Sequence, residues 1–243
     1  GYAEADPTAD VEGHDAASKA AILASLGFHT RVKFDDVSCE GISQVTAEDI
    51  EAARDAGYVI KLLAICERIT DQNGREAVAS RVHPTLVPVD HPLASVNESY
   101  NAIFVEAEAA GRLMFYGNGA GGAPTASAVL GDLVGAARNK VHGGRAPGEN
   151  TYANLPIASL GDVRTRYHID MEVEDRTGVL AELSAIFAAR DISLKTVRQE
   201  ESGNDARLIV VTHSARESDL AATVEDLKKA PAVKAVDSVL RLI

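Results

Sequence analysis

The sequence contains no tryptophan, and aromatic residues make up only 5% of its 243 residues. Alanine, valine, isoleucine and leucine must therefore build the core of a chain that is 46% hydrophobic and long enough for one large domain or two modest ones. No apolar run is long enough to span a bilayer, and we expect no signal peptide. Basic residues are also few, since 24 Lys and Arg face 36 Asp and Glu, a formal charge of −12. This balance argues against nucleic acid and anionic membranes as partners, because both require a basic face.

Cysteine and histidine patterns are equally sparse. The two cysteines, Cys39 and Cys66, form no CxxC motif and have no histidine partner at metal-ligand spacing, so we expect free or buried thiols in a reducing cytoplasm. The seven histidines show no HxH, HExxH or HxxxH pattern. Neither a GxSxG nucleophile motif nor a GxxxxGK[ST] phosphate loop occurs. We therefore expect no metal ion and no hydrolase of these classes.

A stretch rich in Gly, Pro, Asn and Ser divides the chain. We predict a first domain over residues 1–140, a linker over residues 141–164 and a second domain over residues 165–243. The first domain is predicted to be mixed α/β. Its predicted elements are helices over 16–30 and 45–58, strands over 58–67 and 81–89, a hairpin over 101–117, and a glycine-rich loop that runs into a helix over 117–139.

Side-chain patterns add detail to these elements. The first helix is expected to place Ile22, Leu23 and Leu26 on one side. Thr46 can cap the second helix, with Asp49 at the position of a capping acid. The prolines of the second strand predict that this strand lies at a sheet edge.

The second domain has a more regular pattern. His168, Asp170 and Glu172 alternate with apolar residues, which predicts a strand over 165–175 with one face in water. A helix, two strands, a helix and a last strand are expected over 178–190, 192–201, 206–214, 217–230 and 233–243. The order βαββαβ is typical of a four-stranded antiparallel sheet with two helices on one face, the ferredoxin-like arrangement.

The opening segment is unusually acidic. Five carboxylates precede Lys19, and they belong to Glu4, Asp6, Asp10, Glu12 and Asp15. An ordinary surface pair between Asp15 and Lys19, four residues apart on one helix face, would explain part of this pattern. A cation site is a second interpretation, although the regular DxDxDG spacing is missing. The third is catalytic: a partly buried lysine, oriented by a carboxylate, can exchange a proton with a carbonyl or alcohol while other carboxylates bind a substrate ammonium.

Two further segments could bind ligands through backbone N–H groups. The loop 117–122 has four glycines before a helix, which would let an anion or a flat ring approach the backbone, or would simply make a tight turn. It is not a GxGxxG dinucleotide motif. In the segment 175–183, Gly178 at a helix start could let a ligand carboxylate bind free N–H groups, and a plain turn between strand and helix is the alternative.

Taken together, these stretches resemble homoserine dehydrogenase in its longer form with a C-terminal ACT domain. The resemblance covers essentially the whole chain and is most specific in its first 24 residues. The matching stretches, in order, are GYAEADPTADVEGHDAASKAAILA, GISQVTAEDIEAARDAGYVIKLLA, VHPTLVPVDHPLASV, NAIFVE and GAGGAPTASAV. The resemblance favours the catalytic interpretation of the opening carboxylates.

The resemblance implies roles for the residues of this segment. Lys19 would be the catalytic lysine near the reacting hydroxyl or carbonyl, and Asp15 would bind substrate and position the lysine. Glu4 would also bind substrate, while Asp10 and Tyr2 would lie in the homoserine pocket. The implied reaction is the reversible NAD(P)H-dependent reduction of aspartate 4-semialdehyde to homoserine, in threonine, methionine and isoleucine biosynthesis.

It also implies where the coenzyme would contact this chain. Gly119, Ala120, Gly121 and Thr125 would pack against the nicotinamide end. The family begins with a Rossmann domain that carries the GxGxxG loop and a second functional lysine, and the chain starts at Gly1 without Met or that domain. We therefore expect a fragment of a longer protein, with little coenzyme binding or activity of its own. The preference for NAD or NADP would be determined in that other domain.

The second domain resembles ACT domains, which bind amino acids between paired copies. Asp175, Gly178, Val179 and Leu180 match the ligand loop, whereas Ser193 stands where an Asn is common. Threonine, the pathway product, is the expected inhibitor. We expect a cytoplasmic homodimer or homotetramer with small-molecule partners only. The competing hypothesis is a non-catalytic module for amino-acid sensing and oligomerisation.

Overall fold

The structure, a computed structural model, describes residues 5–71, 73–144, 151–202 and 205–243. Contacts within the chain define two units, each built from two stretches of sequence. The first unit comprises residues 1–7 and 88–150, and the second comprises residues 8–87 and 151–243. These units are defined by contacts, and the division into domains at residues 141–164 remains a prediction.

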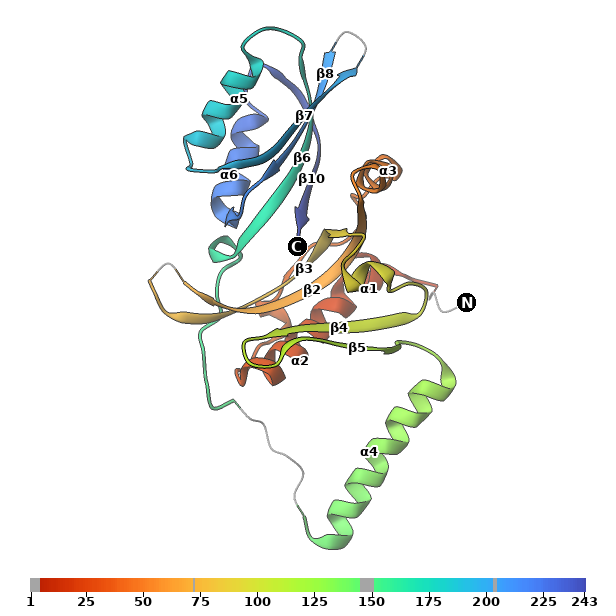
Figure 1. The fold of residues 1–243 in the computed structure, drawn as a ribbon. Coiled ribbons are helices and arrows are strands. Elements are labelled where there is room, and N and C mark those ends of the chain that lie inside the picture. The colour runs from red at the N-terminus through yellow and green to blue at the C-terminus, as the bar shows by residue number, and fades with distance from the viewer. Residues whose placement is uncertain (1–4, 72, 145–150, 203–204) are drawn as a thin grey trace. The chain divides into compact units, whose positions relative to one another are not determined.

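The first unit contains a two-stranded hairpin and one long helix (Figure 1). Its elements are η2 (Pro92–Ser95), β4 (Tyr100–Ala107), β5 (Gly111–Asn118) and α4 (Gly122–His142). β4 and β5 pair antiparallel from Tyr100↔Asn118 to Ala107↔Gly111. The hairpin and the helix after the glycine-rich loop confirm the prediction for this stretch. None of the helices in the described part of the chain combines the length and apolarity of a membrane span.

The second unit contains an eight-stranded mixed sheet with helices. Its helices are α1 (Thr8–Val11), α2 (His14–Phe28), η1 (Phe34–Asp36), α3 (Ala47–Asp55), η3 (Leu160–Asp162), α5 (Val179–Ala188) and α6 (Glu217–Leu227). Its strands are β1 (Ser38–Cys39), β2 (Tyr58–Thr70), β3 (Glu76–Pro88), β6 (Arg164–Glu174), β7 (Leu194–Ser202), β8 (Asp205–Thr212), β9 (Ala215–Arg216) and β10 (Val233–Leu242). The strand order is β1-β3-β10-β6-β8-β7, with β2 on β3 and β9 on β6.

The C-terminal region, residues 164–242, has the predicted ferredoxin-like arrangement. β10, β6, β8 and β7 are antiparallel neighbours, and α5 and α6 cover one face of their sheet (Figure 1). The core between sheet and helices is apolar and fully buried, and includes Ile169, Met171, Leu183, Phe187, Leu208, Leu220 and Leu227. The βαββαβ prediction is therefore confirmed.

The predicted edge position of the strand over 81–89 is wrong. β3 is interior, because β2 pairs with it and both β1 and β10 pair with it in parallel. β1 pairs at Arg81 and Val82, and β10 pairs at Thr85 and Leu86. Pro84 lies between these two short pairings, so the strand tolerates a residue that has no N–H to donate.

The side of α2 that carries Ile22, Leu23 and Leu26 is not its buried side. Ile22 and Leu26 are largely exposed, and α2 instead buries alanines, namely Ala17, Ala20, Ala21 and Ala24. These alanines pack with Val78 and Val82 of β3. Small side chains let the helix axis approach the sheet closely, which larger ones would prevent. The helix itself and the cap of α3 are as predicted, since the Thr46 hydroxyl accepts a hydrogen bond from the Asp49 N–H.

The polar face predicted for the strand over 165–175 does not lie in water. His168 and Asp170 are buried, and a buried cluster on that side joins Ala53 of α3 to Leu86 and Leu240. Arg207 donates to both carboxylate oxygens of Asp170. The buried charge is thereby paired, as a charge in a protein interior has to be.

Within the second unit, residues 155–158 of the predicted linker lie beside β3. The N–H of Val78 donates to the carbonyl of Pro156 over 2.9 Å, and the N–H of Ala158 donates to the carbonyl of Val78 over 2.8 Å. Leu155 and Ile157 pack on the cluster formed by α2 and β3. The chain therefore adds a short extended segment beside β3 before it enters β6.

Candidate functional site

The predicted catalytic pair forms at the start of α2. Lys19 Nζ lies 2.6 Å from Asp15 Oδ2, one helical turn away, and the two side chains are 57% and 47% exposed. The contact is the ordinary geometry of residues four apart on a helix. The described chain does not bury the ammonium, so the pair is open to a substrate.

A tight turn joins α1 to α2 beside β1 and β3. Asp10 lies in α1, and Gly13, at φ +78°, begins α2. A Cβ at Gly13 would lie 3.1 Å from both Cys39 Sγ and Val82 Cγ1, so this position favours glycine by both conformation and space. Asp10, Asp15 and Lys19 thus flank one tight turn. Tyr2 and Glu4, the other predicted substrate residues, lie outside the described residues.

The predicted coenzyme residues lie in the first unit, around the start of α4. Gly121 has φ +124° and precedes the helix, and the Thr125 N–H donates to its carbonyl. A Cβ at Gly119 would lie 2.0 Å from Asn101 Nδ2, and the Gly119 N–H donates to the carbonyl of Ser99. A side chain at position 119 would therefore displace the Asn101 side chain of β4, while Gly121 provides the backbone turn into the helix.

A cavity of about 190 Å³ opens at the predicted ligand loop of the C-terminal region. Gly178, Val179 and Leu180 line it, whereas Asp175 and Ser193 are not among its lining residues. Gly178, at φ +93°, begins α5, and the first N–H groups of a helix have no partner within it. The cavity therefore combines a helix start with apolar walls, a combination suited to a small zwitterion.

Sequence reasoning missed the polar side chains of this cavity. Arg176, Glu174 and Gln199 also line it. Arg176 bonds Glu174 over 2.6 Å and Glu182 over 3.0 Å, and these hydrogen bonds raise the pKa of Arg176. The charged residue inside the turn at 175–178 was the available sequence signal. Gln199 had no local signal, because it reaches the cavity from β7, a separate strand.

Metal and disulfide chemistry find little support in the described chain. Its residues form no group of three or more His, Cys, Asp or Glu side chains that could hold a metal ion. Cys39 and Cys66 are free thiols. Burial raises the pKa of both thiols, and the charge of Glu12 adds to this effect at Cys39.

Comparison with known proteins gives a consistent result. Residues 1–134 match the family model "Homoserine dehydrogenase", and residues 167–232 match the model "ACT domain". Homoserine dehydrogenases of Corynebacterium glutamicum and Mycobacterium tuberculosis are 76% and 58% identical over the whole chain. The chain spans about half the length of these relatives, 54% and 56%.

Solved structures agree with the sequence relatives. A homoserine dehydrogenase from Thiobacillus denitrificans superposes with a TM-score of 0.90 at 37% identity, covering 100% of this chain and 56% of its own. That of S. aureus superposes with a TM-score of 0.67 at 30% identity and the same coverage. With more than half of its residues inside the family model and an ACT domain behind them, this chain belongs to the homoserine dehydrogenase family.

Proposed function

We propose that this chain is the substrate-binding and regulatory part of an NAD(P)-dependent homoserine dehydrogenase, which interconverts homoserine and aspartate 4-semialdehyde. The observation that carries the proposal is the Lys19–Asp15 pair, 2.6 Å apart and open to a substrate, inside the stretch that matches the family model. The product would supply threonine, methionine and isoleucine biosynthesis. Two free cysteines are compatible with a cytoplasmic location.

The residues of the turn between α1 and α2 divide the chemistry. Lys19 donates a proton to the aldehyde oxygen during reduction and removes it from the hydroxyl in the reverse direction. Asp15 holds the ammonium in place over 2.6 Å. Asp10, with Glu4 and Tyr2, binds the ammonium and polar groups of the amino-acid end, which fixes the reacting carbon near the lysine.

The glycine loop fits the role of a coenzyme contact. Among the described residues, nothing lies within 4 Å of a Cβ built on Gly122, so the backbone at the start of α4 is open. Gly119, Ala120, Gly121 and Thr125 would hold the nicotinamide end there, since a flat ring can approach a backbone without side chains. The coenzyme, when bound, supplies or accepts the hydride. A complete enzyme would add the dinucleotide-binding domain.

The cavity of the ACT domain supports an amino-acid effector. Its lining provides a carboxylate for an ammonium at Glu174, a helix start for a carboxylate at Gly178, and apolar walls at Val173, Leu180 and Leu208. Threonine is the effector we propose. Asp175 and Ser193 would act at the partner copy or outside the cavity wall.

A homodimer or homotetramer is the assembly we propose. Large apolar side chains of the hairpin and α4 are exposed in the described chain, among them Ile103, Phe115, Val129, Leu130 and Leu133. An exposed apolar surface of this kind is typical of an interface. A second copy, or the other half of a complete enzyme, would cover it.

Substitution of Lys19 tests the catalytic role. In the chain completed with the other half of the Corynebacterium glutamicum relative, Lys19→Ala should lower kcat about 10²- to 10⁴-fold in a homoserine oxidation assay. Lys228→Ala is the matched control, because Lys228 and Glu225 form a pair of 2.7 Å that is 51% and 58% exposed. A kcat of Lys19→Ala near that of the control would refute the role.

The 243-residue chain should have almost no turnover without the other half. Normal turnover of the chain alone would contradict the division of function we propose. A completed chain that folds, binds amino acids and does not oxidise homoserine would favour the sensing and oligomerisation module instead.

Threonine and isoleucine titrations by calorimetry test the ACT site, with Arg176→Ala against the exposed Arg112→Ala as control. No heat from either amino acid would favour purely structural ACT pairing.

A further inference from the structure

Arg241 lies where the sheet of the ACT domain joins β3. β10 pairs antiparallel with β6 along its length, and Arg241 is opposite Tyr167 there. On its other side, Arg241 pairs in parallel with Thr85 of β3. The backbone of Arg241 therefore lies between a strand of the ACT domain and β3, the strand that packs against α2.

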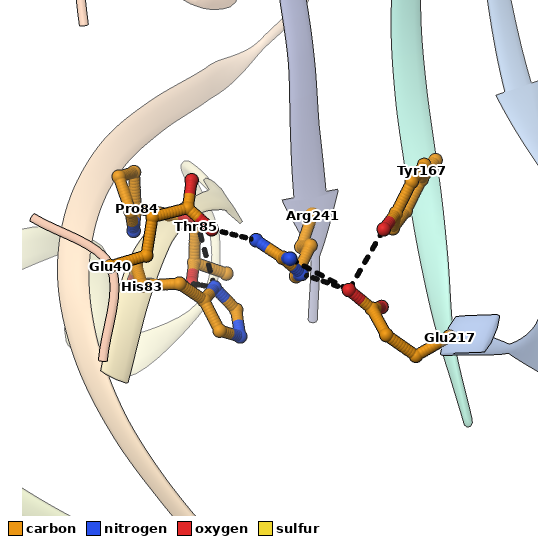
Figure 2. Close-up of polar contacts among 7 residues, drawn as sticks. All are labelled: Glu40, His83, Pro84, Thr85, Tyr167, Glu217 and Arg241. Carbon is orange, nitrogen blue, oxygen red and sulfur yellow. Dashed lines mark hydrogen bonds and ion pairs between the residues drawn. The ribbon is translucent and has the colours of Figure 1, made fainter. Parts of the chain in front are cut away.

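The side chain of Arg241 is held in one position by buried partners (Figure 2). Its Nε and Nη2 donate to Glu217 Oε1 over 2.8 and 2.6 Å, and the Tyr167 hydroxyl donates to the same oxygen over 2.8 Å. The side chains of Arg241 and Glu217 are only 15% and 5% exposed. Burial opposes the charge, but the bonds and charge of Glu217 outweigh it and raise the pKa of Arg241. The guanidinium is thus a permanent, oriented cation.

The remaining guanidinium nitrogen points out of the ACT domain. Nη1 donates to Glu40 Oε2 over 2.6 Å, across 201 positions of sequence, as Figure 2 shows. Glu40 directly follows β1, and its own N–H donates to the carbonyl of Val82 over 2.8 Å. Because Arg241 is already ordered by Glu217, the bond to Glu40 requires the ordering of only one further side chain.

The segment 39–42 in turn supports the turn between α1 and α2. The Ile42 N–H donates to the carbonyl of Val11 over 2.8 Å, and Cys39 Sγ donates to the carbonyl of Glu12 over 3.2 Å. A Cβ at Gly41 would lie 2.5 Å from the carbonyl oxygen of Val11, so these backbones are in direct contact. A displacement of the segment 39–42 would therefore move the turn.

We propose that Arg241 is a positioning residue for the dehydrogenase reaction: by holding Glu40 it fixes the segment 39–42, and through it the turn that carries Asp10, Asp15 and Lys19. The inference rests on the proposed catalytic role of Lys19. It makes the last strand of the ACT domain a structural support of the substrate site. Hydrogen bonds and backbone contacts run without a break from Arg241 through Glu40 and the segment 39–42 to the turn.

Glu40→Ala is the variant that tests the link most directly. It removes the oxygen that accepts the bond from Arg241 Nη1, on a side chain that is 52% exposed, and leaves the Arg241–Glu217–Tyr167 contacts in place. Arg241→Gln would leave Glu217 buried without its cation and is expected to impair folding. Glu225→Ala, which breaks an exposed pair with Lys228 on α6, is the matched control.

In the completed enzyme, Glu40→Ala should lower kcat/KM for homoserine about tenfold and leave the KM for coenzyme unchanged. Glu225→Ala should change neither. A loss that affected both substrates equally, with a lower melting temperature, would indicate a merely structural role and overturn the inference.

Amide hydrogen exchange tests the positioning step without any assay of activity. Glu40→Ala should raise exchange about threefold or more in peptides that cover residues 8–20, while β8 of the ACT domain stays unchanged. Unchanged exchange over 8–20 overturns the inference. A wild-type completed chain without homoserine turnover overturns the proposed function instead, and the exchange result still decides whether Arg241 holds the turn.

Discussion

The C-terminal region buries its apolar side chains, whereas the hairpin and α4 of the first unit leave most of theirs exposed in the described chain. In the C-terminal region, the apolar side chains of the sheet and of α5 and α6 form one buried cluster. In the first unit, α4 is 21 residues long and has no buried residue. The two regions do not differ in the kind of residue they contain but in what covers it. The apolar side chains of the C-terminal region are covered by its own helices, whereas those of α4 are not covered in the described chain.

The largest difference in the free energy of unfolding is expected between two leucine substitutions, one in each region. Leu220 is 0% exposed and Leu133 of α4 is 61% exposed. Leu220→Ala should lower the free energy of unfolding by about 3–5 kcal/mol, because it leaves a cavity. Leu133→Ala should change it by less than about 0.5 kcal/mol. Urea denaturation followed by circular dichroism measures both, and equal losses would show that α4 is covered in the isolated chain.

The second largest decrease in the free energy of unfolding is expected from the loss of a buried carboxylate. Glu217→Ala removes the acceptor of Arg241 and Tyr167 and leaves a largely buried cation, which should cost about 3 kcal/mol in the free energy of unfolding. Glu106→Ala, which breaks the exposed pair with Arg112 in the hairpin, should produce no measurable loss. Thermal melting of both variants checks the difference. A small loss from Glu217→Ala would mean that Glu40 compensates Arg241 on its own.

Acid should destabilise the second unit through a buried histidine. Burial, together with the charge of Arg241, lowers the pKa of His83 to about 3. The histidine pKa in the unfolded chain is near 6.5. Between about pH 6.5 and pH 3, His83 is therefore protonated in the unfolded chain and neutral in the folded chain. The free energy of unfolding should therefore be highest above about pH 6.5. It should fall as the pH drops from 6.5 towards 3, by at most about 1.4 kcal/mol per pH unit.

The corresponding measurement compares His83→Gln with wild type at pH 7 and pH 5. His83→Gln should flatten the pH dependence, whereas substitution of the exposed His142 on α4 should not. Burial also lowers the pKa of His168, so part of the acid sensitivity should persist in His83→Gln. An unchanged slope in His83→Gln would show that His83 becomes protonated in the folded state.

The smallest effect on stability is expected from charges placed on α4. Leu130→Glu combined with Leu133→Glu should leave the unfolding transition unchanged, because both side chains are exposed. The same change should weaken self-association in sedimentation velocity, since a charge in an apolar interface is costly. Association equal to wild type would assign the oligomer contact to another surface.

Local pattern predicted much of this molecule because helix and strand signals are local. The Thr46 cap with Asp49, the hairpin over 101–117 and the βαββαβ order all followed from neighbours a few residues apart. The pair of Asp15 and Lys19 followed from helical spacing alone. The same reasoning identified Gly178 at a helix start, but not Gln199, which reaches the cavity from another strand.

What the sequence by itself determined is the order of elements, the position of the acidic turn before Lys19 and the family to which the chain belongs. Only the tertiary structure decided which faces are covered. It buried His168 and Asp170 beneath α3, made β3 interior despite its prolines, and buried the alanines of α2 rather than its leucine and isoleucine side chains. It also joined Arg241 to Glu40 across 201 positions. The physical reason is that burial and ion pairing depend on which distant segment comes to lie against a residue, and no local period encodes that.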